Sequence, residues 1–283
     1  FITRNSNYDV EYGAYASDLR VLSQEIAKNA TEAASGKKAA FEELMRSRNE
    51  FEKKLNLITQ GNNETGLPAS TLPFETGVSE RWETVKANAD RILENKETVL
   101  TLHQIAKTLN ETIPQLQIEY EDVVMNLLAN EAPADQISVA ERQSLRAERI
   151  VRSVNNILTG DEDAAIAANR FGEDATLFGR VMNAMFDGNE AMDISKVTDE
   201  DAIYGLEAIA ELFDFGDSNV KAILATSPEL FKVRNAANSI FQNSIALLDE
   251  TKTLSTQLQN QADSRFATPN KAYIILALII FLI

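Results

Sequence analysis

The stretch VLTLHQIAKTLNETIPQLQIEYEDVVMNL, residues 99–127, decides the fold class because its apolar residues recur every three or four positions. A spacing that averages about 3.5 residues places one stripe of an α-helix against partner helices in a bundle or coiled coil. The positions of this stripe are Val99, Leu102, Ala106, Leu109, Ile113, Leu116, Tyr120, Val123 and Leu127. We therefore predict a long helix that is packed along its whole length.

The same spacing is found in residues 12–33, in residues 41–58 and again near the end of the chain. The last stripe consists of Leu230, Val233, Ala237, Ile240, Ser244, Leu247, Thr251, Leu254 and Leu258. No segment alternates convincingly between apolar and polar residues, as a half-buried strand does. The sequence predicts an all-α fold, with two tandem antiparallel helical-bundle modules built from long heptad-patterned helices.

Helix breaks and helix starts divide the chain further. Residues 61–73, GNNETGLPASTLP, predict a loop because Gly, Pro, Asn, Ser and Thr dominate them. Gly160 and the pair Gly188–Asn189 predict two more breaks. Ser138–Glu141 has the S-x-x-E form of a capping box, and Ser227–Pro228 predicts an N-cap followed by proline at the first helical position.

Several of these landmarks recur at a nearly constant distance. The pairs are Ile26 with Ile150 and Gly36 with Gly160 at 124 residues, and Phe51 with Phe178, Gly61 with Gly188 and Asn62 with Asn189 at 127. The stripe in 99–127 maps onto the stripe in 230–258 at a distance of 131. We therefore expect a duplicated module of about four helices, with module 1 at 8–134 and module 2 at 135–265.

The composition excludes several classes of function. The 283-residue chain has a formal net charge of −16, which argues against a nucleic-acid partner because nucleic-acid binders carry basic patches. It has no cysteine, so disulfides, zinc–thiolate sites and thiol chemistry are excluded.

Residues that could catalyse a reaction are scarce. His103 is the only histidine, and its position beside Leu102 is more typical of a helix flank than of a general base. No glycine-rich phosphate loop is present, and the acidic runs lack the alternation of a calcium loop. We expect no enzymatic activity, no catalytic residue, no cofactor and no metal.

The chain closes on AYIILALIIFLI, residues 272–283, a run of twelve uncharged and almost wholly apolar residues. A membrane-spanning helix needs roughly 20 apolar residues, so we interpret residues 266–283 as the start of a second transmembrane helix. Residues 1–7 are interpreted as the end of a first one. The alternative is a buried core helix, since apolar runs of this length also occur in cores. Two flanking membrane helices are the outline of a bacterial receptor.

Pro114 lies inside the 99–127 stripe, where proline removes a backbone hydrogen bond and costs about 3 kcal/mol in an undisturbed helix. Its counterpart in the second module, Ile245, has no such effect. Pro114 is therefore a hinge candidate, and the alternative is a bend tolerated over the bundle core.

The segment DLRVLSQEIAKNA, residues 18–30, resembles the opening of the PilJ-type sensor domains of type IV pilus methyl-accepting chemoreceptors. It is more distantly similar to the first sensor helix of nitrate and nitrite sensor kinases. Further similar stretches are ETIPQLQIEYEDVV (111–124), ERQSLRAERI (141–150), DATLFGRVM (174–182), AMDISKVT (191–198) and TSPELFKVRNAAN (226–238). The resemblance covers nearly all of residues 8–262.

The resemblance implies a receptor of the bacterial inner membrane whose helical region lies in the periplasm and controls twitching motility and surface sensing. It implies chemotaxis coupling proteins and a histidine kinase as cytoplasmic partners, and the major type IV pilin as a periplasmic partner. We expect a homodimer that transmits a ligand- or pilin-induced conformational shift. The rival interpretations are a membrane-anchored scaffold or adhesion domain without signalling, and a small-anion-binding sensor module.

In nitrate sensors an arginine of the first sensor helix binds the anion, and the resemblance places Arg20 at that position. The guanidinium fork suits planar oxyanions. With Ser23 and Gln24 beside it, and with Arg146 and Arg149 in the corresponding helix of module 2, it gives a set of candidate ligand-binding residues. The alternative is a structural or salt-bridging role for Arg20.

Overall fold

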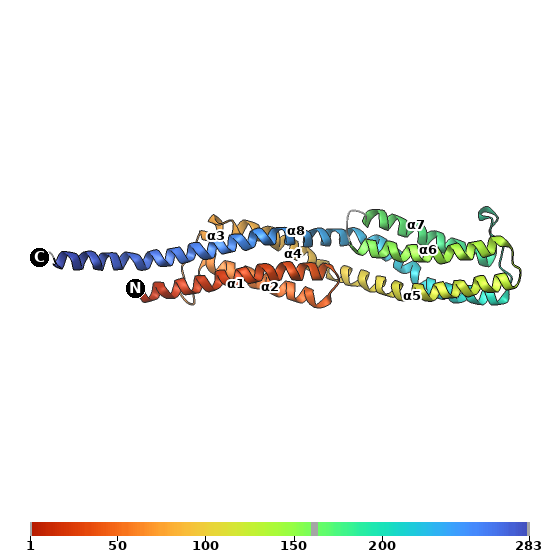
Figure 1. Cartoon of the computed structure of the whole chain (residues 1–283), viewed down its shortest axis with the longest axis horizontal. Coiled ribbons are helices and arrows are strands. Elements are labelled where there is room, and N and C mark those ends of the chain that lie inside the picture. Colours follow the sequence, from red (N-terminus) through yellow and green to blue (C-terminus); the bar gives the residue numbers. More distant parts are fainter. Residues whose placement is uncertain (1, 160–163, 282–283) are drawn as a thin grey trace. The chain divides into compact units, whose positions relative to one another are not determined.

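The computed structural model describes residues 2–159 and 164–281 and consists of helices joined by short connections (Figure 1). The helices are α1 (Ile2–Ala34), α2 (Lys38–Gln60), α3 (Leu72–Glu75), α4 (Val78–Glu94), α5 (Lys96–Ala129), α6 (Ala134–Thr159), α7 (Ala164–Asp187), the 3-10 turn η1 (Glu190–Met192) and α8 (Glu200–Phe281). Within the described residues, extended pairing is limited to two isolated bridges. The predicted all-α helical-bundle fold is confirmed.

The chain forms two compact units. Unit 1 combines Phe1–Glu94 with Asn235–Ile283, and unit 2 is Asn95–Arg234. Unit 1 therefore contains α1 to α4 and the later part of α8, whereas unit 2 contains α5, α6, α7 and the earlier part of α8.

The predicted apolar stripes form the cores of these units. In the stripe of α5, Leu109 is half-buried and the other eight positions are buried. All nine positions of the stripe within residues 230–258 of α8 are buried. Aliphatic side chains that return every three or four residues thus cover one face of each long helix, as expected for bundle packing.

The connection after α2 has the same geometry as the connection after α7. In the first, the Asn62 amide donates to the Leu67 carbonyl at 2.9 Å, and the Ser70 amide donates to the Ile58 carbonyl at 2.9 Å. The second connection repeats both bonds 127 residues later, from Asn189 to Ile194 at 2.8 Å and from Val197 to Met185 at 2.9 Å.

The glycine before each asparagine is required by the backbone. Gly61 and Gly188 have φ values of +82° and +81°, in a region that residues other than glycine rarely adopt. A Cβ atom on Gly61 would also lie 2.4 Å from the Leu67 carbonyl oxygen. The Gly188 break is confirmed, and most of the predicted 61–73 loop is non-helical. Gly160 lies outside the described residues.

The helix start predicted at Ser138 is wrong. Helix α6 begins four residues earlier, at Ala134, directly after Pro133. The Gln136 amide donates to the Pro133 carbonyl at 3.0 Å, and Asp135 brings a negative charge to the first turn, where the helix dipole favours it. Ser138 therefore lies inside the helix and cannot act as its N-cap.

The start predicted at Ser227–Pro228 is also wrong, because α8 continues through both residues. Proline lacks the N–H group that would donate to the Leu224 carbonyl in a regular helix. The Ser227 hydroxyl donates to that same carbonyl at 3.3 Å. A side-chain donor thus replaces the missing backbone donor, and the helix is maintained.

The two compact units draw on both predicted modules. Unit 1 joins α1, α2 and α4 of module 1 to the last stripe of module 2, and unit 2 joins α6, α7 and the start of α8 to α5 of module 1. The module boundaries at 8–134 and 135–265 stay a prediction about the sequence repeat.

None of the helices in the described ranges is both long and apolar enough to cross a membrane. Helix α8 continues to Phe281, and residues 282 and 283 lie outside the described residues. That residues 1–7 and 266–283 belong to membrane helices therefore stays a prediction.

Candidate functional site

The predicted ligand-binding residues of α1 do not all face the same way. Arg20 and Gln24 line an open surface groove of unit 1, whose other residues are Ser17, Val21, Glu25, Lys28 and Leu248. Ser23 is buried, and its hydroxyl donates to the Arg20 carbonyl at 2.8 Å. Arg20 makes no ion pair with any residue that the structure describes, so the structure offers no support for a salt-bridging role.

The two predicted residues of α6 converge on one buried carboxylate of α7. Arg149 Nη2 donates to Asp174 Oδ1 at 2.8 Å, and Arg146 Nε lies 3.9 Å from the same oxygen. The Asp174 side chain is only 7% exposed. Burial lowers the pKa of the Arg146 guanidinium, while the nearby carboxylate of Asp174 raises it in part. A buried charge of this kind needs paired partners, which the two arginines supply.

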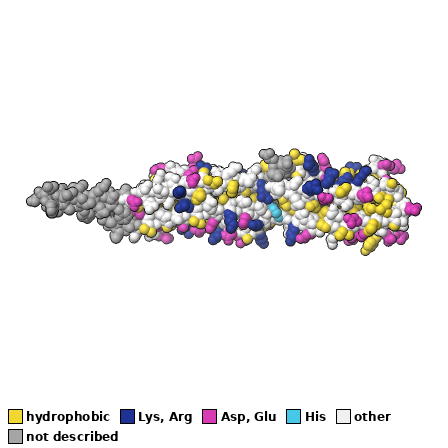
Figure 2. All heavy atoms as spheres, in the orientation of Figure 1, with side chains coloured by type: hydrophobic (Ala, Val, Ile, Leu, Met, Phe, Trp, Pro, Cys, Tyr) yellow, Lys and Arg dark blue, Asp and Glu magenta, His cyan; other side chains and the backbone are white. Residues whose placement is uncertain are grey.

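An open groove of about 430 Å³ extends from this pair between α6 and α7. Its lining residues are Arg149, Arg152, Ser153, Asn156, Ile166, Ala167, Arg170 and Asp174. We call it the α6–α7 groove. Figure 2 shows Lys and Arg side chains gathered over this part of unit 2, although the chain as a whole is strongly acidic. Sequence reasoning missed Arg170 and Asp174, because neither stands out without its neighbours.

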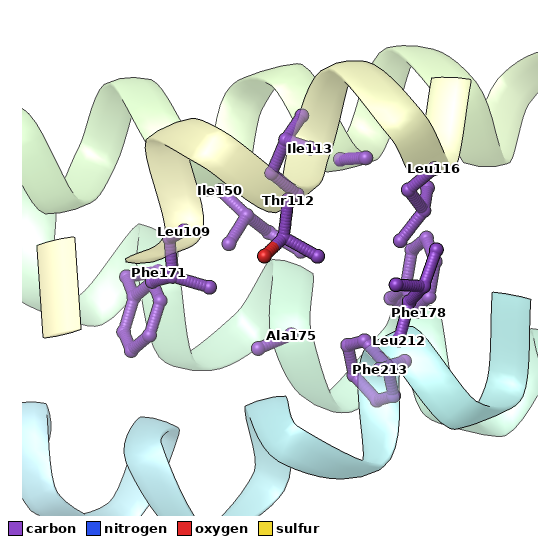
Figure 3. Close-up of a pocket in the computed structure, with 11 residues that line it drawn as sticks. Leu109, Thr112, Ile113, Leu116, Ile150, Phe171, Ala175, Phe178, Leu212 and Phe213 are labelled. Carbon is purple, nitrogen blue, oxygen red and sulfur yellow. The ribbon is translucent and has the colours of Figure 1, made fainter. Parts of the chain in front are cut away.

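A second hollow lies inside unit 2, among the apolar side chains of the bundle (Figure 3). It has a volume of about 20 Å³ and is lined by Leu109, Thr112, Ile113, Leu116, Ala147, Ile150, Phe171, Ala175, Phe178, Leu212 and Phe213. We call it the core cavity. The one hydroxyl group in the lining, on Thr112, donates to the Thr108 carbonyl at 2.9 Å. A cavity without free polar groups does not hold water well, so it is a packing gap.

Unit 1 carries different side chains at the corresponding place. At the 131-residue spacing, Trp82 corresponds to Phe213 and Arg81 corresponds to Leu212. The Trp82 ring stacks on Phe51 with centroids 4.1 Å apart. Arg81 Nε donates to Glu250 Oε1 at 2.7 Å, and its Nη1 donates to Asn243 Oδ1 at 2.9 Å.

The hinge candidate Pro114 lies within α5 and is exposed. Its neighbours Ile113 and Leu116 line the core cavity. Because proline has no N–H group, the carbonyl four residues earlier, on Asn110, lacks its usual helical donor. A weakened turn therefore lies over the packing gap, and the hinge role stays a prediction.

His103 has the role of a helix flank. Its Nδ1 lies 2.8 Å from the Val99 carbonyl oxygen, one turn earlier in α5. Burial lowers the pKa of the imidazole. Within the described residues, no cluster of three His, Asp or Glu side chains is arranged to hold a metal ion.

Comparison with known proteins gives consistent matches. The family model "Type IV pili methyl-accepting chemotaxis transducer N-term" (PilJ) matches residues 1–108. Protein PilJ of Pseudomonas aeruginosa is 52% identical over 268 residues, which are 94% of this chain and 39% of the relative. A relative named for methyl-accepting chemotaxis, AlkN of Alcanivorax borkumensis, is 48% identical over 252 residues, or 89% of this chain and 36% of that protein. The chain thus spans less than two fifths of the length of these relatives.

Proposed function

The chain belongs to the PilJ family of type IV pili methyl-accepting chemotaxis transducers, and from this premise we propose that it is the sensory region of such a receptor. In this proposal the region lies in the periplasm and is tethered to the inner membrane through residues 1–7 and 266–283. It carries out no chemical reaction. Its output passes to coupling proteins and a histidine kinase, and a homodimer is the signalling form.

The observation that carries the proposal is the extent of α8. The earlier part of this 82-residue helix belongs to unit 2 and its later part belongs to unit 1. The helix then continues into the apolar run that begins at Ala272. A single helix that belongs to both cores and continues into an apolar run is suited to convey a small shift in packing to a membrane segment.

The contrast between the units suggests where such a shift begins. Unit 2 has a packing gap beneath Pro114, whereas unit 1 has the larger Trp82 ring and the hydrogen-bonded Arg81 at the corresponding positions. A stimulus that favours one packing of unit 2 over another needs a core with room to repack, because close-packed cores resist deformation. Ligand or pilin contact with unit 2 is therefore the proposed input.

The test interrupts α8 in the complete transducer. A short flexible Gly/Ser segment inserted after Ala262 is expected to uncouple kinase output from the stimulus, because it breaks the helix between the two cores and the membrane. The matched control carries the same insertion between Glu64 and Thr65, in an exposed loop of unit 1. The proposal fails if kinase output still follows the stimulus after the Ala262 insertion.

A further inference from the structure

We propose that the α6–α7 groove of unit 2 binds a small organic anion that carries at least two carboxylate or phosphate groups. Three arginines from two helices meet there: Arg149 and Arg152 of α6, and Arg170 of α7. The groove volume of about 430 Å³ lies within the range of small-molecule sites.

Two of the three cations are available to a ligand. Arg170 has no hydrogen-bond or ion-pair partner among the residues that the structure describes. Arg152 pairs with Glu148 at 2.7 Å, but both side chains are more than half exposed, and such a pair contributes little. An incoming carboxylate or phosphate can take its place. Asp174 neutralises part of the charge of the third cation, Arg149, and fixes its position.

The corresponding surface of unit 1 keeps only one of the three cations, because Lys28 corresponds to Arg152 at the 124-residue spacing. By the 124- and 127-residue spacings, Arg149 corresponds to Glu25, and Arg170 corresponds to Glu43. Asp174 of unit 2 corresponds to Ser47 of unit 1, and both residues are buried. The set of three arginines is therefore a property of unit 2 alone, and the shared bundle geometry does not require it.

The arrangement of the groove selects the class of ligand. A guanidinium group binds a carboxylate or phosphate through two parallel hydrogen bonds, so each anionic group occupies one arginine. A ligand with two such groups can join Arg152 on α6 to Arg170 on α7, whereas an anion with a single carboxylate or phosphate group engages one helix only. Ile166 and Ala167 offer an apolar surface to the carbon skeleton.

Binding at this groove would act on the helices around the core cavity. Phe171 and Ala175 follow Arg170 and Asp174 directly in α7, and both line that cavity. A ligand that joins α6 to α7 fixes the spacing of two of its walls. This signalling consequence rests on the proposed function, but the binding itself does not.

The experiment is calorimetric titration of the purified chain with citrate, inorganic phosphate and acetate at constant ionic strength, which removes general screening effects. We expect saturable binding of citrate at least tenfold tighter than that of acetate. The Arg152→Gln/Arg170→Gln variant is expected to weaken citrate binding at least tenfold. The matched control, Lys38→Gln/Arg46→Gln, removes two exposed cations from unit 1 and is expected to change it less than twofold.

The absence of saturable binding of both citrate and phosphate overturns the inference, as does unchanged binding in the double variant. Tight phosphate binding with weak citrate binding would contradict the requirement for two anionic groups and would also overturn the inference. If circular dichroism shows that the double variant is unfolded, Arg170→Gln alone decides, since that side chain is exposed and has no described partner. Confirmed binding without any effect on kinase output would contradict the signalling consequence and leave both the site and the proposed function in place.

Discussion

Trp82 stacks on Phe51 with ring centroids 4.1 Å apart and an angle of 21° between the rings, which makes this pair the aromatic centre of unit 1. Unit 2 places Phe213 against Phe178 at 4.5 Å and 34°, at the corresponding positions. The smaller ring in unit 2 accompanies the core cavity. Several testable differences between the two units follow from this substitution.

Filling the core cavity should stabilise unit 2. Ala175→Val adds two methyl groups at the cavity wall, and each buried carbon contributes up to about 0.8 kcal/mol. We expect the free energy of unfolding in urea to rise by about 0.5–1 kcal/mol. The control is Ala89→Val in unit 1, where Ala89 is fully buried, and there we expect a loss of about 1–3 kcal/mol from overpacking. Equal losses in both variants would show that the cavity cannot accept added atoms.

Truncation of the two aromatic residues should affect stability unequally. Trp82→Ala removes a fully buried side chain from the core of unit 1, and substitutions of this kind cost about 3–5 kcal/mol. Phe213→Ala should cost less, because its ring already borders an empty volume and loses fewer contacts. Urea unfolding followed by circular dichroism measures both variants, since Trp82 is the only tryptophan available for fluorescence. A larger loss for Phe213→Ala would contradict this account.

The stability of the chain should depend on pH through its only histidine. Burial lowers the pKa of His103 below its ordinary value, Arg234 lowers it further, and the bond to the Val99 carbonyl opposes both effects. Above the unfolded value of about 6.5, the imidazole is neutral in both states, so its titration does not change the free energy of unfolding. As the pH falls below about 6.5, the unfolded state takes up the proton first, and the free energy of unfolding decreases.

The His103→Gln variant should lack this decrease. Urea unfolding between about pH 7.5 and pH 5.5 compares the two proteins in a range where carboxylates titrate little. Proton NMR of the single imidazole gives the pKa directly. A value above that of a free histidine would reverse the predicted sign.

Replacement of Pro114 should separate a hinge from a tolerated bend. Pro114→Ala restores a helical hydrogen-bond donor in α5 and should raise the free energy of unfolding by about 1–3 kcal/mol. If Pro114 is a hinge, the same variant in the complete transducer also reduces the change in kinase output on stimulation. A stabilised receptor with a normal response would identify a tolerated bend.

The stripes of α5 and α8 could be predicted from the sequence because helical periodicity is a local property, recorded every three or four residues. The sequence could not show that the helices continue through Ser138 and Ser227, since local capping signals compete with other donors and acceptors. At Pro228 the competitor is a hydroxyl one residue away, and a motif search reads that hydroxyl as a cap.

Local sequence patterns also could not identify the helices against which each apolar stripe packs. The 99–127 stripe fits any apolar face of matching length, and the sequence does not state that it packs with α6 and α7. Similarly, Arg170 and Asp174 acquire meaning only beside Arg149. One signal was present. Alignment of the two repeats pairs the charged Asp174 with the neutral Ser47, and both residues are buried.

The division of the chain between the units sets an order of assembly during synthesis. Unit 2 is the uninterrupted stretch Asn95–Arg234, whereas unit 1 needs residues from both sides of it. Every residue of unit 2 has therefore been synthesised before the closing helix of unit 1, and domains generally fold as units as they emerge. Residues 1–94 must wait, with the apolar faces of α1, α2 and α4 incompletely covered, until the last part of α8 arrives.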